Sequence, residues 1–176
     1  NKEIVDAIEK KKCKAKSVTV KENNAIFVEQ KNKVLGYVGT PTKIDSKLIL
    51  NIIKENFIPV ISPMGIDDNK HTYNINADTC AGAIAAALAA RKLIVLTDVV
   101  GVLNKKGDLI SRLDSKEVKK YNADGTINGG MIPKVQTCLN ALENGVEAAH
   151  ILDGRQPHAL LLEIFTENGT GTMIHE

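Results

Sequence analysis

The segment DTCAGAIAAALAARKLIVL, residues 78–96, decides the fold class. Its first part, in which alanine fills most of residues 81–90, predicts a closely packed helix from Asp78 to about Arg91. Its last four residues, LIVL, are apolar at every position and predict a strand that is buried on both faces. A helix that leads straight into such a strand is typical of an α/β fold with parallel strands.

The same alternation extends along the chain. One helical pattern begins at Asn1, and four others cover residues 45–55, 115–121, 133–143 and 157–165. Strand patterns cover residues 17–20, 25–29, 34–38, 57–62, 109–113, 150–152 and 170–174. We therefore expect a three-layer αβα sandwich around a mainly parallel sheet. Because parallel sheets are built from strand–helix–strand units and this sequence starts with a helix, we expect the fold to be incomplete at its N-terminus.

The composition limits the classes of protein that fit. The chain has 176 residues, and 23 Lys and Arg against 21 Asp and Glu give a net charge of +2. That balance, with 3% aromatic residues and no Trp, argues against a dedicated nucleic-acid binder. No apolar run approaches the roughly 20 residues that span a bilayer, so we expect no membrane segment. Three widely spaced cysteines favour a reducing, cytoplasmic compartment over a disulfide framework.

The histidines do not suggest a catalytic or metal centre. The four of them, His71, His150, His158 and His175, lack metal-ligand spacing, and none is near a Ser or Cys in a triad-like pattern. A hydrolase or a metalloenzyme has no support, and we predict no metal-ligating residue.

The segment YNINAD, residues 73–78, is the first group of residues that could carry chemistry. In extended chain Asn74 and Asn76 project from the same face, where two amides can donate hydrogen bonds to a carboxylate or an acyl carbonyl. Asp78 stands at the expected helix start, where the pattern favours an N-cap. The alternative is a carboxylate that orients a lysine or an attacking group, and both roles can coexist.

The segment GGMIPK, residues 129–134, is the second. Glycines before a helix let phosphates approach backbone N–H groups at its positive end, and Lys134 in the first turn could neutralise a transferring phosphoryl group. A glycine pair in this position is more often a simple turn. Thr97 and Asp98 follow the apolar strand at its carboxyl end, where open α/β sheets bind ligands, so they are candidate nucleotide contacts.

Four segments in this order resemble a known family: LGYVGTPTKID (35–45), IPVISPMGIDDNKHTYNINAD (58–78), LTDVVGVL (96–103) and GGMIPKV (129–135). Together they resemble the amino-acid kinase family, in particular its branch that acts on N-acetyl-L-glutamate in arginine biosynthesis. The resemblance implies a carbamate kinase-like fold. It also implies that residues 1–78 are the remainder of an acetylglutamate-binding and dimerisation lobe and that residues 79–176 are an ATP-binding lobe.

The resemblance further implies a reaction and a set of roles. ATP, with Mg²⁺ held mainly by its phosphates and water, would phosphorylate the side-chain carboxylate of N-acetyl-L-glutamate. In the family, the positions that match Asn74 and Asn76 hold the acetylglutamate. The position that matches Asp78 organises the catalytic lysines, and the position that matches Lys134 stabilises the phosphoryl group in transfer. The nucleotide would be bordered by Thr97, Asp98, Gly129, Gly130 and Met131.

The end of the sequence resembles the arginine-inhibited members of the family. There the positions matching Glu163 and Gly169 help to form an effector pocket for L-arginine, and the protein is a homodimer or a hexamer. Considered alone, Glu163 would be an exposed helix carboxylate. The family's N-terminal part supplies a second phosphate-binding lysine, a Gly-Gly turn and an arginine for the substrate. We therefore expect this chain alone to be nearly inactive, and the complete protein to act in the cytoplasm, or in the plastid stroma of a eukaryote.

Two alternatives remain open at this stage. One is another member of the same superfamily, acting on carbamate, glutamate, aspartate or a nucleoside monophosphate. The other is a noncatalytic nucleotide-binding fragment, against which the presence of Asp78 and Lys134 counts, since a binder needs neither.

Overall fold

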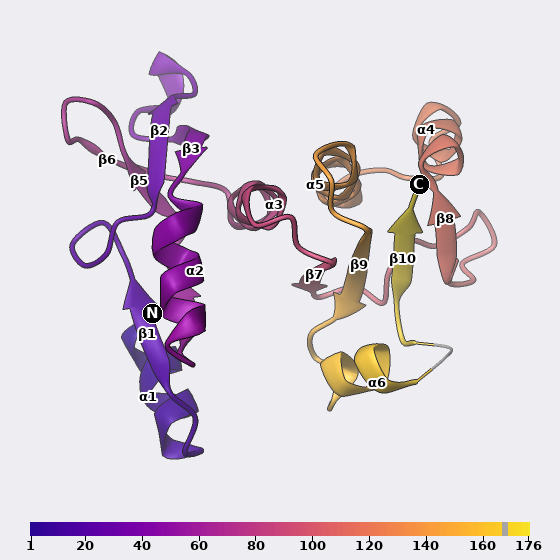
Figure 1. Ribbon diagram of the computed structural model, residues 1–176. Helices are drawn as coiled ribbons and strands as arrows, with labels where there is room; N and C mark the ends of the chain where they lie inside the picture. Colours follow the sequence, from indigo (N-terminus) through magenta and orange to yellow (C-terminus); the bar gives the residue numbers. More distant parts are fainter. Residues whose placement is uncertain (167–168) are drawn as a thin grey trace. The chain divides into compact units, whose positions relative to one another are not determined.

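Helices and strands alternate along most of the chain (Figure 1). The computed structural model describes residues 1–166 and 169–176, and the chain divides into two units, Asn1–Leu88 and Ala89–Glu176. The first unit contains α1 (Lys2–Lys10), β1 (Ala15–Val18), β2 (Ile26–Gln30), the 3-10 helix η1 (Lys33–Leu35), β3 (Gly39–Ile44), α2 (Ser46–Lys54), β4 (Ile58–Ile61), β5 (Met64–Ile66), β6 (Thr72–Asn74) and α3 (Ala77–Ala87). The second contains β7 (Lys92–Thr97), β8 (Arg112–Asp114), α4 (Ser115–Ala123), α5 (Met131–Glu143), β9 (Ala148–Asp153), α6 (Ala159–Phe165) and β10 (Thr172–His175).

The first unit is built on two small sheets. β1 pairs in parallel with β4, while a second sheet has the strand order β3-β2-β5-β6. Helices α1 and α2 pack against the first sheet, and α3 packs against β3. Helix α2 starts where the Asp45 side chain accepts a hydrogen bond from Leu48 N at 3.0 Å, and it turns Ile49 and Ile52 into the core.

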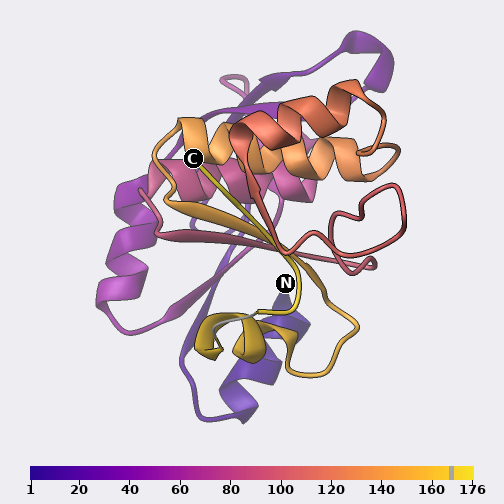
Figure 2. The same ribbon diagram turned by 90° about the vertical axis from the view of Figure 1, so that its right-hand side faces the viewer.

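The second unit is a four-stranded sheet with helices on both faces. Its strand order is β7-β9-β10-β8, with β7 parallel to β9, β10 antiparallel to β9 and β10 parallel to β8. Helices α4 and α5 cover one face and α6 the other (Figure 2). The layers meet over side chains that are almost fully buried, among them Val95, Ile151, Leu152 and Ile174. The apolar run LIVL does form part of β7, but this strand is at the edge of the sheet and Leu96 is 53% exposed, so the expectation of burial on both faces is wrong at Leu96.

The α/β class expected from the sequence is confirmed, and antiparallel pairs accompany the parallel ones. The strand expected at residues 34–38 is wrong. There the Asn32 side chain accepts from Val34 N at 2.8 Å and starts η1, so Val34 is left 90% exposed rather than in a sheet. The alanine-rich helix also ends earlier than expected, at Ala87, because the backbone of Ala89 is left-handed, with φ +46°.

The chain divides into its two units ten residues later than the sequence suggested. The sequence placed the boundary between two lobes after residue 78, whereas the compact units divide after Leu88, so that α3 belongs to the first unit. Which substrate each part binds stays a prediction.

Within residues 1–166 and 169–176, no helix combines the length and the apolar character needed to cross a bilayer.

Candidate functional site

A cavity of about 650 Å³ lies entirely within the second unit, next to the carboxyl end of β7. This size is typical of small-molecule sites, and the end of a parallel strand is where open α/β sheets bind ligands. The residues that line it come from the end of β7, the segment and the hairpin that follow, the loop between α4 and α5, and the start of α5. They are Thr97, Asp98, Val99, Gly101, Val102, Leu103, Asn104, Lys105, Gly107, Gly125, Thr126, Ile127, Asn128, Gly130, Met131 and Lys134.

One wall of the cavity is anchored to β10. The buried Thr172 hydroxyl accepts a hydrogen bond from Val102 N at 2.8 Å and donates one to Ile110 O at 2.7 Å. A Cβ atom on Gly101 would lie 2.6 Å from this hydroxyl oxygen, and the φ of Gly101 is +139°. Only glycine fits there without strain, so the wall is held close to the sheet.

An ion pair joins the hairpin to the loop before α5. Lys105 Nζ lies 3.5 Å from Asp124 Oδ2. Asp124 Oδ1 also accepts hydrogen bonds from the backbone N and the hydroxyl of Thr126, at 2.9 and 2.5 Å. The bonds from Thr126 and then the charge of Lys105 lower the pKa of Asp124. Both partners are partly exposed, so the pair fixes geometry more than it adds stability.

The structure brings together most of the residues predicted to border a nucleotide. Thr97, Asp98, Gly130 and Met131 line the cavity, whereas Gly129 stands directly beside the lining. The Thr97 hydroxyl donates to Asp98 Oδ1 at 3.2 Å.

Lys134 lines the same cavity from the first turns of α5. The glycine pair before this helix does form a turn, in which Met131 N donates to Asn128 O at 3.1 Å. No atom lies within 4 Å of the Cβ position of Gly129 or Gly130. The turn therefore leaves open space against its backbone, and a phosphate could approach it there.

Asn74 and Asn76, the residues predicted to hold the acetylglutamate, belong to the first unit. Tyr73 and Ile75 are buried while Asn74 and Asn76 are exposed, so the expected alternation is confirmed. The favoured N-cap role of Asp78 is wrong. The N-cap of α3 is Asn76, whose side chain accepts from Thr79 N at 3.0 Å, and Asp78 lies inside the first turn.

A charged pair lies at the end of β9, outside the lining of the cavity. Asp153 is paired with Thr97 across the sheet, and Arg155 donates to both of its carboxylate oxygens at 2.9 Å. These hydrogen bonds lower the pKa of Asp153 to about 2. Two polar residues of the hairpin, Asn104 and Lys105, line the cavity although they were not among the predicted site residues.

The residues predicted to form an effector pocket lie together on the other face of the second unit. Glu163 Oε1 is 2.6 Å from His150 Nδ1, and Glu163 Oε2 accepts from Thr170 N at 2.8 Å. A Cβ on Gly169, whose φ is +59°, would lie 2.5 Å from Glu163 Oε2. Glu163 is therefore not an exposed helix carboxylate, since only 7% of its side chain is accessible.

Comparisons with known proteins agree on one family. Residues 1–153 match the family described as "Amino acid kinase family". The acetylglutamate kinase of Pelagibacter ubique is 49% identical over 176 residues, which is all of this chain and 61% of that protein. The chain thus spans about 61% of the length of the curated relatives that it matches.

Solved structures show the same fold. An N-acetylglutamate synthase from Neisseria gonorrhoeae, complexed with coenzyme A and L-arginine, has a TM-score of 0.81 at 26% identity and matches over 93% of this chain and 38% of its own. A Giardia carbamate kinase, with a TM-score of 0.72 at 17% identity, matches over 98% of this chain and 66% of its own. The family match over most of the sequence, supported by this fold, shows that the chain belongs to the amino acid kinase family.

Proposed function

We propose that the complete protein transfers the γ-phosphoryl group of ATP to the side-chain carboxylate of N-acetyl-L-glutamate. The products are N-acetyl-L-glutamyl 5-phosphate and ADP. The observation that carries the proposal is the 49% identity to an acetylglutamate kinase along all 176 residues. The cavity beside β7 adds support, because its lining includes five residues expected at a nucleotide site: Thr97, Asp98, Gly130, Met131 and Lys134.

The proposed chemistry needs only the residue types that are present. A carboxylate is already a nucleophile at neutral pH, so no general base is required, and catalysis reduces to alignment and charge neutralisation. In this proposal the Lys134 ammonium neutralises the phosphoryl group in transfer. Asn74 and Asn76 hold the acetylglutamate through their amides, and Asp78 orients the lysines that act on the phosphates.

Mg²⁺ is proposed to arrive with the nucleotide. Among residues 1–166 and 169–176, no group of three or more His, Cys, Asp or Glu side chains could hold a metal ion by itself. Mg²⁺ in kinases is commonly bound through substrate phosphates and water with few protein ligands. The proposal therefore assigns the ion to the phosphates of ATP. Bound there, it would offset the negative charge of the phosphates.

The test is ADP release by the complete gene product with MgATP and one of four acceptors: N-acetylglutamate, glutamate, aspartate or carbamate. Release that depends on N-acetylglutamate supports the proposal. Release with another acid would keep the kinase assignment and overturn the substrate. ADP binding without release for any acceptor would make the protein a noncatalytic nucleotide binder.

Inhibition by L-arginine is proposed as the regulation of this activity, with the complete protein a homodimer or hexamer in the cytoplasm. The buried carboxylate of Glu163, next to the loop at Gly169, has the charge that a guanidinium group needs. We expect arginine to inhibit the wild type and to lose its effect in Glu163→Gln. Turnover that stays constant up to millimolar arginine would contradict the proposal.

A further inference from the structure

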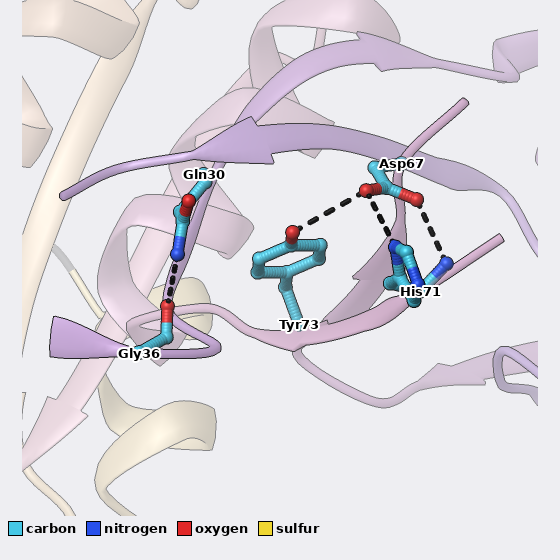
Figure 3. Close-up of polar contacts among 5 residues, drawn as sticks. All are labelled: Gln30, Gly36, Asp67, His71 and Tyr73. Carbon is cyan, nitrogen blue, oxygen red and sulfur yellow. Dashed lines mark hydrogen bonds and ion pairs between the residues drawn. The ribbon is translucent and has the colours of Figure 1, made fainter. Parts of the chain in front are cut away.

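The turn between β5 and β6 is organised by one carboxylate, that of Asp67 (Figure 3). Asp67 Oδ1 accepts a hydrogen bond from the backbone N of His71 at 2.7 Å. Asp67 Oδ2 lies 3.2 Å from His71 Nδ1 and accepts the hydroxyl of Tyr73 at 3.3 Å. Backbone bonds close the same turn, from Asp67 N to His71 O at 3.1 Å and from Lys70 N to Asp67 O at 3.0 Å.

This carboxylate is partly buried yet held in its charged form. Only 15% of the Asp67 side chain is accessible. Loss of solvent acts to raise its pKa, but the hydrogen bonds from His71 and Tyr73 outweigh that effect and lower it. Burial and the neighbouring Asp67 charge raise the pKa of Tyr73, so the phenol remains a donor to the carboxylate. The bond between the two therefore persists across the neutral pH range.

Tyr73 is followed directly by Asn74, and both residues are held from the other side by the β2–β3 connection. The Tyr37 ring packs on the Tyr73 ring with centroids 5.5 Å apart, and Asn74 N donates to Tyr37 O at 2.9 Å. That connection is itself fixed, because Gln30 Nε2 donates to Gly36 O at 2.9 Å (Figure 3).

Strand β6 needs such support, because it is short and stands at the end of its sheet. It has three residues, and in the order β3-β2-β5-β6 it has a neighbouring strand on one side, while a single bridge from Asn74 to Val38 is the backbone pairing on its other side. Successive side chains of a strand point to opposite faces, so the seating of Tyr73 in the core sets where the exposed Asn74 amide points. Short edge segments of this kind open locally unless side chains hold them.

We propose that Asp67 is a positioning residue for Asn74: through Tyr73 it fixes β6 so that the Asn74 amide meets the acyl acceptor in one orientation. The inference rests on the proposed function, since it assumes that Asn74 contacts N-acetylglutamate. It assigns no contact with substrate to Asp67 itself.

The first test measures positioning without substrate. Amide hydrogen exchange of Asn74 N–H, which is bonded to Tyr37 O, is followed by NMR in the complete gene product and in two variants of it. Asp67→Asn removes the charged acceptor, and Asp68→Asn removes the same charge from the exposed neighbour in the same turn. We expect about tenfold faster exchange in Asp67→Asn, the loss typical of a hydrogen bond to a charged group, and no change in Asp68→Asn. Equal rates in the two variants would overturn the inference.

The second test measures the consequence in the complete gene product. We expect both Asp67→Asn and Tyr73→Phe to raise the KM for N-acetylglutamate about five- to tenfold while the KM for ATP stays within twofold. Asp68→Asn is expected to match the wild type. A uniform loss of kcat with both KM values unchanged would show a merely structural role and overturn the inference. If the wild type does not use N-acetylglutamate, the proposed function fails, and the exchange measurement still decides whether Asp67 positions Asn74.

Discussion

Lys134 is the residue whose charge the proposed chemistry uses most directly. We predict that Lys134→Ala lowers kcat of the complete protein about 10²–10³-fold, the loss found when one transition-state charge partner is removed. ADP affinity, measured by titration calorimetry, should change far less, because apolar walls and backbone groups of the cavity remain. The control is Lys106→Ala, a lysine of the hairpin after β7 that is outside the lining. Equal kcat for the Lys134 variant and the wild type would remove Lys134 from the mechanism.

Gly101 tests how tightly the cavity wall is held. A methyl group at position 101 would collide with the buried Thr172 hydroxyl, and the alanine that carries it would have to adopt the backbone φ of +139°. We expect Gly101→Ala to lower the free energy of unfolding by about 1–3 kcal/mol in urea denaturation. Gly130→Ala is the matched control, since its φ is −67° and no atom lies within 4 Å of its Cβ position. Two variants of equal stability would contradict the tight wall.

At the residue scale, the sequence predicted which side chains of a strand share a face better than it predicted caps and long-range partners. The alternation of Asn74 and Asn76 follows from strand geometry and could be predicted. The cap of α3 could not, because Asn76 and Asp78 are both good N-caps and the choice depends on the backbone, which is extended at Asn76 with ψ 131°. The buried state of Glu163 depends on His150, thirteen residues away on another element, so no local pattern could reveal it.

Two elements of the second unit are joined by the His150–Glu163 pair, which ties α6 to β9. Both side chains are more than 90% buried. We predict that Glu163→Ala lowers the free energy of unfolding by about 1–3 kcal/mol, because it leaves a buried imidazole without its partner. Glu147→Ala, which removes an exposed ion pair with Arg91, should be neutral within error. Chemical denaturation that ranks these two variants in the reverse order would contradict the structural assignment.

The end of β9 should make the unit sensitive to acid. The folded-state pKa of Asp153, about 2, is below the value of roughly 3.9 expected in an unfolded chain. A depressed folded pKa gives stability that is present above about pH 4 and is lost as the pH falls toward 2. We therefore predict that Arg155→Gln, which removes the partner, loses less stability than the wild type between pH 5 and pH 2.5. Urea unfolding of both proteins at pH 5 and at pH 2.5 measures these losses. An equal loss of unfolding free energy in the variant and the wild type would contradict the prediction.

At the element scale, most helices and strands could be predicted because caps and apolar periodicity are local signals. Helix α4 is an example, since Asp114 and Glu117 form a reciprocal capping box that the sequence displays. Three strands, β3, β5 and β6, were not predicted. The reverse error is residues 34–38, which are apolar enough for a strand, but Asn32 caps a 3-10 turn and Val34 projects away from the core. Burial there depends on tertiary neighbours, which a pattern of apolar residues does not contain.

For the whole molecule, nucleotide binding and catalysis should be separable. The cavity belongs wholly to the second unit, while the chain spans about 61% of the length of its acetylglutamate kinase relatives. We predict that the 176-residue chain binds MgADP in titration calorimetry but releases no ADP from MgATP with N-acetylglutamate. The complete gene product should do both. Turnover by the purified 176-residue chain would contradict this division.

Every residue that lines the cavity comes after Leu96, whereas the amides proposed to hold the acyl acceptor come before Leu88. Under the proposed assignment, mutation therefore acts on donor and acceptor through different parts of the gene. A lineage could acquire a new acceptor by drift in the earlier part while it inherits the nucleotide pocket unaltered. Such a modular history would make residues after 89 poor guides to substrate choice and residues 58–78 the segment to sequence first.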